Sequence, residues 1–200
     1  MPPTASVARE QRKTARREAI LAAAQSVFAR KGFDGATIAD IARAAGVASG
    51  TVYLYYESKI ELFAALNARL WEVVISAMRD AIAPPDVRGG TRARVHAVFT
   101  TANQHRNLLR LVFLNPDPRT EVARRMSNAD EARVQPLVDI LQGGMDAGTV
   151  RRAEPAMLAR LISSLVIIAL YQCFIQRDGE DVHAYEDMVT EMIVGALTPS

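Results

Sequence analysis

The stretch that most constrains the fold of this chain is the run from Thr37 to Tyr56, TIADIARAAGVASGTVYLYY. Its first half repeats small apolar residues at helical spacing, and Gly46 follows where this pattern ends. Thr37 is followed three residues later by Asp40, a spacing typical of a capping box at a helix start. The first half therefore predicts one short helix that begins after Thr37 and stops at Gly46.

The second half of this run predicts another short helix, which begins at about Ser49. Val52 and Tyr56 are four residues apart and face inward, because positions at this spacing share one side of a helix. Two short helices joined by a turn that contains glycine predict a helix-turn-helix, whose second helix lies in the major groove of DNA. This rotation leaves four side chains largely outside, namely those of Ser49, Thr51, Tyr53 and Tyr55.

Gly50 separates a functional interpretation of this motif from a purely structural one. A threonine cap and a glycine stop occur in any helical protein, so they carry little weight alone. Glycine inside a helix costs about 1 kcal/mol relative to alanine. A missing side chain would allow the backbone at Gly50 to lie against a phosphate group. Together with the outward tyrosines of a very short helix, it favours DNA binding.

Residues from about Thr14 to Leu66 resemble the DNA-binding domain of the TetR (tetracycline repressor) family of bacterial transcriptional regulators. The resemblance rests on KGF before the first motif helix, threonine at its start, AGV at the turn, GTVY in the second helix, and an aromatic residue followed three positions later by lysine. Two places depart from the family's pattern, Ala48 and Leu54-Tyr55. The base preference of the relatives is therefore not carried over.

The resemblance implies a homodimeric transcriptional regulator, and most simply a repressor that a small apolar effector releases from a palindromic operator. Its two recognition helices would lie about 34 Å apart, one turn of DNA. An activator remains open, because the sign of regulation depends on where the operator lies. We expect phosphate contacts from Thr37, Tyr53 and Lys59, and base-edge contacts from Ser49, Thr51 and Tyr55. The residues that the resemblance places at the DNA surface are Thr37, Ser49, Gly50, Thr51, Tyr53, Tyr55 and Lys59.

Composition and periodicity predict an all-α protein of about nine helices. Half of the 200 residues are apolar, few are aromatic, and no strand-like alternation runs far. The single cysteine, Cys173, allows no disulfide within the chain, and no apolar signal core precedes the first helix, so we expect a cytoplasmic protein. The predicted division is a flexible basic arm at 1–13, a helix-turn-helix domain at 14–60 with its motif at 37–56, and a larger effector-binding and dimerisation domain at 61–200.

Charge is distributed unevenly along the chain. Residues 1–59 carry a net charge of +4, whereas residues 60–200 carry −2. Within residues 1–17, five Lys or Arg side chains stand against Glu10 alone. Basic residues next to a helix-turn-helix favour contacts with phosphates, although a solvated tail explains Arg9 to Lys13 equally well.

Apolar periodicity also predicts the remaining helices. A first helix at about 15–30 packs on the motif, and a long helix at 58–82 is long enough, about 37 Å, to link two cores. Pro84-Pro85 and Gly89-Gly90 predict a loop after it. The helices expected in the second domain cover about 91–104, 107–114, 119–145, 155–175 and 182–197.

The segment Leu161–Ile175 is apolar nearly all round and must be covered on both sides. It is too short for a membrane span, which needs about 20 residues. Its second side therefore needs a partner, as does the apolar stripe of the last helix. Two copies of the pair 155–175 and 182–197 would form a four-helix bundle across a two-fold axis, and the family resemblance implies the same homodimer.

The second domain shows no pattern of an enzyme, a metal site or a cofactor site. Its histidines lack metal-ligand spacing, and its glycine pairs lack the Lys and Ser/Thr of a phosphate loop. It resembles the regulatory half of the family, which encloses a pocket for a small molecule, here an acyl, aromatic or drug-like apolar effector. The candidate lining residues are Phe99, Asn103, Phe113, Met126, Tyr171 and Gln172.

Two other functional classes stay open at the level of the sequence. One is a regulator that works through a protein partner without an effector, which a fully packed second domain would support. The other is a helical small-molecule-binding protein or enzyme with a vestigial helix-turn-helix, which a catalytic constellation in a deep pocket would support.

Overall fold

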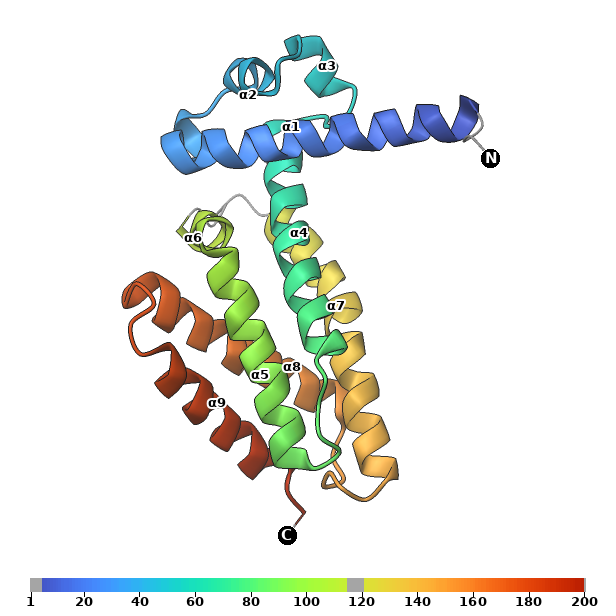
Figure 1. Cartoon of the computed structure of the whole chain (residues 1–200), viewed down its shortest axis with the longest axis vertical. Coiled ribbons are helices and arrows are strands. Elements are labelled where there is room, and N and C mark those ends of the chain that lie inside the picture. Colours follow the sequence, from blue (N-terminus) through green and yellow to red (C-terminus); the bar gives the residue numbers. More distant parts are fainter. Residues whose placement is uncertain (1–4, 115–120, 200) are drawn as a thin grey trace.

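A computed structural model describes residues 5–114 and 121–199, with the backbone alone at residues 5, 6, 8 and 121–132. Its described part contains nine α-helices and no strand, which confirms the predicted all-α fold. A π-helical turn at Gln172–Gln176 extends the eighth helix. The helices are α1 (Ala5–Gly35), α2 (Ile38–Ala45), α3 (Ser49–Tyr53), α4 (Lys59–Asp80), α5 (Val87–Gln104), α6 (Arg106–Leu114), α7 (Glu121–Asp146), α8 (Pro155–Tyr171) and α9 (Val182–Leu197) (Figure 1).

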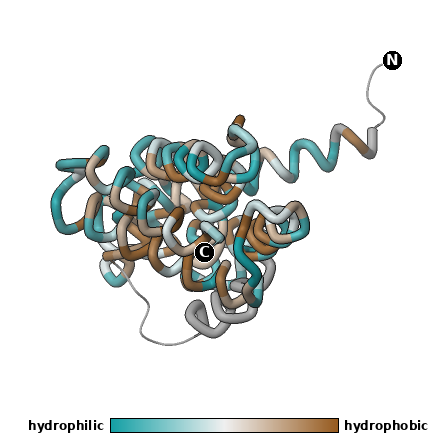
Figure 2. Tube along the Cα trace, turned by 90° about the horizontal axis from the view of Figure 1, so that it is seen from below, coloured by the Kyte–Doolittle hydropathy of each residue, from teal (hydrophilic) through white to brown (hydrophobic). Residues whose placement is uncertain are grey.

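The helices form a small head on a larger body. In Figure 1, α1 lies across the top of the body, and α2 and α3 lie above it. Helix α4 descends from the head into the body, where it packs against α5, α6 and α7. Helices α8 and α9 cover the body by packing on α7 and α5, respectively. Hydrophobic residues follow the inward sides of these helices (Figure 2).

The predicted capping box at the start of α2 and the predicted glycine stop at its end are both present. The Asp40 N–H donates to the Thr37 hydroxyl (3.1 Å), and the Thr37 N–H donates to the Asp40 carboxylate (3.2 Å), which completes the capping box. Gly46 ends the helix in the left-handed conformation, with a φ of 65°, which favours glycine. These local interactions fix both ends of α2.

Helix α3 depends on tertiary packing more than on its own caps. It is five residues long, and its N-cap, Ala48, makes no side-chain hydrogen bond. Val52 and Tyr56 are both fully buried in the head, as predicted. These two anchors therefore fix the rotation of α3 and determine which side chains face outward.

A cluster of three phenylalanines joins α1 to α4. After Gly32, whose φ is 70°, the chain turns and places the Phe33 ring 5.6 Å from that of Phe28. Phe63 on α4 stacks edge-on against Phe33, with ring centroids 5.3 Å apart. Phe33 therefore folds back onto the core of α1.

The start of the chain differs from its prediction. Helix α1 begins at Ala5, ten residues before the expected start, so residues 5–13 of the predicted flexible arm are helical. The sequence AREQRKTARREA consists mostly of residues with high helix propensity, and no Gly or Pro separates it from the core of α1.

The prediction of a loop at Gly89-Gly90 is wrong, because both glycines lie in the first turn of α5. Asp86 caps this helix by accepting a hydrogen bond from the Gly89 N–H (2.8 Å). A Cβ atom on Gly89 would lie only 3.0 Å from Pro84 Cβ, and one on Gly90 would lie 3.0 Å from the Pro84 carbonyl oxygen. The two glycines therefore allow the loop at Pro84 to pack closely against the first turn of α5.

We predict that Asp40 makes the head sensitive to acid. The Lys31 ammonium lies 2.8 Å from the Asp40 carboxylate and, with the Thr37 hydrogen bonds, lowers the pKa of Asp40 from 3.8 to about 2. A lowered folded-state pKa gives stability that is present above about pH 4 and is lost as the pH falls through 2. Asp40→Asn should lower the melting temperature at pH 7, and its difference from wild type should shrink towards pH 2.

The matched control for this prediction is Asp34→Asn, because Asp34 is an exposed carboxylate at the end of α1, close in sequence to Asp40. Thermal melts followed by circular dichroism at several pH values measure both variants. A difference between Asp40→Asn and wild type that stays constant from pH 7 to pH 2 would contradict the assignment.

Candidate nucleic-acid interface and ligand cavity

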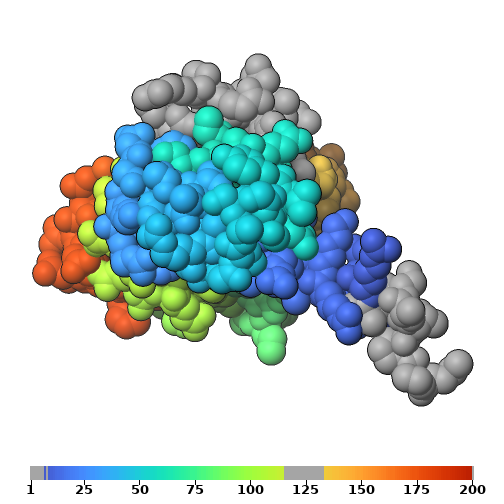
Figure 3. Space-filling model, turned by 90° about the horizontal axis from the view of Figure 1, so that it is seen from above, coloured from blue at the N-terminus to red at the C-terminus, as the bar shows by residue number. Residues whose placement is uncertain are grey.

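The outward face of α3 carries several of the predicted DNA-contacting residues. Seen from above, α2 and α3 form the near face of the head (Figure 3). Ser49 and Gly50 are exposed, and Tyr53 is 54% exposed. Thr51 and Tyr55 are half-buried, and Tyr55 packs against the core. The structure therefore brings these residues onto one surface, with less of the Tyr55 ring available than the sequence predicts.

The fold itself does not require a glycine at position 50. A Cβ atom built on Gly50 would meet no other atom within 4 Å, and the residue is exposed. Its helix cost of about 1 kcal/mol relative to alanine is thus not offset by closer packing inside the protein. The free space lies outside the molecule, on the exposed face of α3.

Lys59 is engaged inside the protein, which differs from the phosphate contact that we expected. Its ammonium donates to the backbone carbonyls of Phe33 (2.7 Å), Ala36 (3.0 Å) and Asp34 (3.4 Å). It also lies 4.5 Å from the centroid of the Phe33 ring. An ammonium has three N–H donors, and all three have partners here. Lys59 therefore ties the start of α4 to the turn between α1 and α2.

The hydroxyl of Thr37 is likewise engaged inside the protein. It accepts from the Asp40 N–H and donates to the Asp40 carboxylate (2.8 Å). The residue as a whole is exposed. A phosphate at Thr37 would therefore contact the exposed part of a hydroxyl that already makes two hydrogen bonds to Asp40.

Two exposed side chains of the motif were missed by the sequence prediction. Leu54 is 81% exposed, and the side chain of Arg43 on α2 is 80% exposed. Leu54 lies four residues after Gly50 and so shares its face, a spacing that could have identified it. An apolar side chain on a recognition helix can contact the methyl group of thymine.

The N-terminal part of α1 presents a basic stripe, defined as Arg9, Arg12, Lys13 and Arg16. These spacings of three, four and seven residues place the four side chains on one face of the helix. All four are exposed, and none forms an ion pair within the described part of the chain. Figures 2 and 3 show this part of α1 reaching out beyond the rest of the head.

The body contains a cavity of about 570 Å³ between α4, α5, α7, α8 and α9. This volume is typical of small-molecule sites, which occupy roughly 300–1,000 Å³. The described lining is mostly aliphatic, with the Trp71 indole from α4 on one wall. Its polar side chains are Arg94, Arg133, Arg160, Thr91, Ser163 and Ser164.

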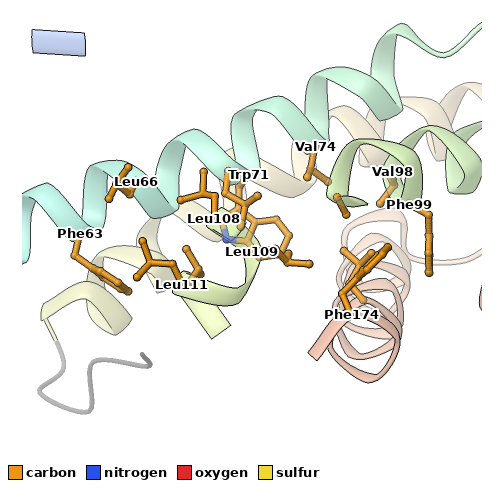
Figure 4. Close-up of a cluster of buried hydrophobic side chains, with 14 of the residues drawn as sticks. Phe63, Leu66, Trp71, Val74, Val98, Phe99, Leu108, Leu109, Leu111 and Phe174 are labelled. Carbon is orange, nitrogen blue, oxygen red and sulfur yellow. The ribbon is translucent and has the colours of Figure 1, made fainter. Parts of the chain in front are cut away.

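None of the predicted lining residues with described side chains lies on this cavity. Phe99 is fully buried beside Phe174, with ring centroids 6.1 Å apart (Figure 4). The Phe113 ring packs edge-on against both Trp71 (6.4 Å) and Tyr171 (5.6 Å). These aromatic rings fill the core and so cannot line its open space. The exposed residues Asn103 and Gln172 face solvent, and the side chain of Met126 lies outside the described residues.

Comparison with known proteins identifies the family. The model of the bacterial regulatory proteins of the tetR family matches residues 20–66, which include α2 and α3. The transcriptional activator FasR of Mycolicibacterium smegmatis is 32% identical over 154 residues, a match that spans 74% of this chain and 70% of FasR. The chain belongs to the TetR family.

Another relative extends the similarity over most of this TetR-family chain. The repressor DhaR of Mycobacterium sp. strain GP1 is 25% identical over 194 residues, 94% of this chain and 95% of DhaR. These relatives are transcriptional regulators, which confirms that the TetR-family protein is a regulator and not an enzyme. Within the described residues, no group of three His, Cys, Asp or Glu side chains could hold a metal ion.

Solved structures with little sequence identity share the fold of this TetR-family protein. FadR of Bacillus subtilis, in complex with stearoyl-CoA, superposes with a TM-score of 0.76 over 90% of this chain and 98% of FadR, at 19% identity. A TetR-family regulator of Shewanella sp. PV-4 gives a TM-score of 0.73 over 92% and 99% of the two chains, also at 19% identity. The similarity covers both the head and the body.

We predict that Lys59 stabilises the TetR-type head. Lys59→Met keeps the aliphatic stem but leaves three carbonyls without their charged donor, so the free energy of unfolding should fall by about 2 kcal/mol. Urea unfolding followed by circular dichroism measures this change. Lys13→Met, an exposed lysine of α1, is the matched control and should leave stability within about 0.5 kcal/mol. Equal stability of the two variants would show that the carbonyl contacts contribute nothing.

Proposed function

We propose that this TetR-family protein is a homodimeric regulator that binds a palindromic operator with α3 and is released by a small apolar effector in the cavity. The observation that carries the proposal is the outward face of α3, where Ser49, Gly50 and Tyr53 are exposed and Gly50 leaves open space. In a dimer the two recognition helices would enter successive major grooves about 34 Å apart.

The division of contacts follows from exposure on the head. Ser49, Thr51 and Tyr55 lie nearest to base edges, with Leu54 against a thymine methyl group. Thr37 and Tyr53 approach phosphates, and Gly50 allows the backbone itself to do so. The basic stripe of α1 adds further phosphate contacts to one side of the motif. Lys59 acts indirectly, by fixing the turn that positions α2.

The experiment that tests DNA recognition is selection of bound sites from random duplex DNA with the purified protein. We expect a palindrome whose half-site centres are about 10 base pairs apart. Its affinity should fall steeply with salt, because phosphate contacts release counterions. Bound pools without a shared sequence would contradict specific recognition, and an affinity that salt leaves unchanged would contradict the phosphate contacts.

Gly50→Ala should separate stability from DNA binding. The added methyl group meets nothing inside the protein, so helix propensity should raise the free energy of unfolding by up to about 1 kcal/mol. The same methyl group would occupy the space of the DNA backbone, so affinity for the selected operator should fall about tenfold or more, which is 1.4 kcal/mol. Urea unfolding and fluorescence anisotropy measure the two effects.

Gly143→Ala is the matched control, because Gly143 is also an exposed glycine within a helix, α7, with nothing within 4 Å of a built Cβ atom. It should raise stability without changing operator affinity. Unchanged affinity in Gly50→Ala would remove the proposed approach of the DNA backbone to this residue.

The dimer is proposed from two exposed apolar stripes. Met157, Leu161 and Ile168 are each 59–63% exposed along one face of α8, and Met188 and Met192 are more than half exposed on α9. By length and composition alone, the helix Pro155–Gln176 could cross a membrane. In this protein, 39% of its most apolar 18-residue stretch is buried against other helices. A second copy of the α8–α9 pair would cover the exposed apolar side chains of both helices and form a four-helix bundle.

Leu161→Glu should therefore convert the dimer into a monomer, because it places a charge at the centre of the α8 stripe. Sedimentation velocity measures the change in mass. Ile82→Glu is the control, since Ile82 is 99% exposed in the loop after α4 and away from both stripes. A Leu161→Glu protein that remained dimeric would place the interface elsewhere.

Helix α4 supports control of DNA binding by an effector. Its first half lies in the core of the head, and Trp71, Val74 and Met78 in its second half line the cavity. The DNA-binding part would then end at about residue 60 and the effector and dimerisation part would comprise 61–200, with α4 continuous between them. An effector that binds one orientation of α4 better shifts the spacing of the two heads. The complex of FadR with stearoyl-CoA supports a ligand role for a body of this fold.

The other functional classes are less well supported. A regulator without an effector would be expected to have a packed body, whereas this body contains the cavity. A vestigial motif does not explain the exposed glycine and tyrosine of α3. The relatives include both an activator, FasR, and a repressor, DhaR, so the sign of regulation follows the position of the operator. Such a regulator acts in the cytoplasm, where its DNA is.

A further inference from the structure

On the part of the cavity wall that the structure describes, the charges are all of one sign. Three arginines, Arg94, Arg133 and Arg160, belong to the described lining, and no Asp or Glu side chain does. The remaining polar groups there are hydroxyls of threonine and serine. Arg160 is exposed, whereas Arg94 is half-buried. A half-buried guanidinium is costly unless it is paired, so a neutral apolar ligand alone does not account for Arg94.

Arg94 on α5 is the most informative of the three. Its Nη1 donates to the carbonyl oxygen of Gly90 (3.0 Å), four residues earlier in the same helix, which holds the guanidinium in place. Its Nε is buried without any hydrogen-bond acceptor, and the side chain forms no ion pair with a described carboxylate. Burial lowers the pKa of the Arg94 guanidinium, so this charge is partly desolvated.

The neighbouring arginine on the same helix shows the contrast. Arg92 is exposed on the outer side of α5, where its Nη1 lies 3.1 Å from the carboxylate of Asp187 on α9. Arg94 faces the cavity instead, beside Thr91, whose side chain also lines it and is 9% exposed. The Arg94 guanidinium is thus a positioned donor that lacks its acceptor.

We infer that the effector is an amphiphile with an oxyanion head group, which Arg94 binds through its unpaired Nε while the aliphatic wall of α4, α7 and α8 covers the apolar tail. This inference rests on the proposed function and refines it, because it requires a negative charge on the effector. A carboxylate or a phosphate can each accept hydrogen bonds from a guanidinium in this geometry. The hydroxyl of Thr91 adds a second donor beside it.

The test uses the full-length protein and probes that share one tail. Decanoate, decyl phosphate, 1-decanol and decyltrimethylammonium differ in their head groups, and all are used below their micelle concentrations. Trp71 is the only tryptophan of the chain and lines the cavity, so its fluorescence reports occupancy directly. Decanoate or decyl phosphate should bind at least tenfold more tightly than decanol, and the cation more weakly than both.

The assignment to Arg94 is tested with three variants. Arg94→Gln should reduce the anion-to-alcohol preference to about one, whereas Arg94→Lys, which keeps the charge, should retain part of it. Arg92→Gln is the matched control on the same helix and should keep the full preference. Circular dichroism melts confirm that each variant is folded, and removal of an unpaired charge gives no reason for loss of the fold.

The outcomes separate this inference from the proposed regulation. If decanol binds as tightly as the anions, if no probe binds, or if Arg94→Gln keeps the preference, the inference is overturned. If all four probes bind equally and still release operator DNA, control by an effector stands without a required charge. If anions bind with the Arg94-dependent preference but the operator stays bound, the head-group assignment stands and the proposed release mechanism fails.

Discussion

The fold depends on one constraint, which is that α4 belongs to two cores at once. Leu62, Phe63 and Leu66 are buried in or beside the head, where Phe63 stacks on Phe28 and Phe33. From Trp71 onward, the same helix forms a wall of the cavity. A straight helix of 22 residues, about 33 Å long, has no breaking Gly or Pro that could absorb a displacement between these two regions. Any tilt imposed at the cavity must therefore be felt at the head.

The attachment of α4 to the head is polar as well as apolar. Lys59 at its first turn binds the carbonyls of Phe33 and Asp34 at the end of α1 and of Ala36 just after it. The Ser58 hydroxyl caps α4 by accepting from the Glu61 N–H (3.1 Å). Arg69 forms an ion pair with Glu18 of α1 in the next turns. These contacts link α4 to α1 and to the turn before α2, whereas α3 is held by the buried Val52 and Tyr56, by Tyr55 and by its contacts with α2. Helix α3 is thus held within the head by packing rather than by polar contacts to α4.

The sequence predicts what local chemistry determines, and it fails where packing in space decides. The capping box of Thr37 and Asp40, the stop at Gly46 and the inward turn of Val52 each depend on neighbours within four residues, and all were predicted. The sequence predicts a loop at Gly89 because glycine is typical both of flexible loops and of close packing. Only the position of Pro84 in space shows that close packing is the reason here. The sequence predicts a phosphate contact for Lys59, because its carbonyl partners lie 23–26 residues earlier and no local pattern reveals them.

The lining of the cavity is the feature that the sequence predicts least well. Which side chains border an empty space depends on how the helices pack in three dimensions, and no local pattern records this. The sequence predicts a lining that includes aromatic residues, but large rings pack against one another and close the core, as Phe113 does with Trp71 and Tyr171. Branched aliphatic residues and arginines were left to line the open space. A charged residue at one position of an otherwise apolar helix face is a local signal that the pattern does contain. Arg94 is such an exception, because it lies on the face of α5 that also carries Thr91, Val95 and Val98 and that lines the cavity.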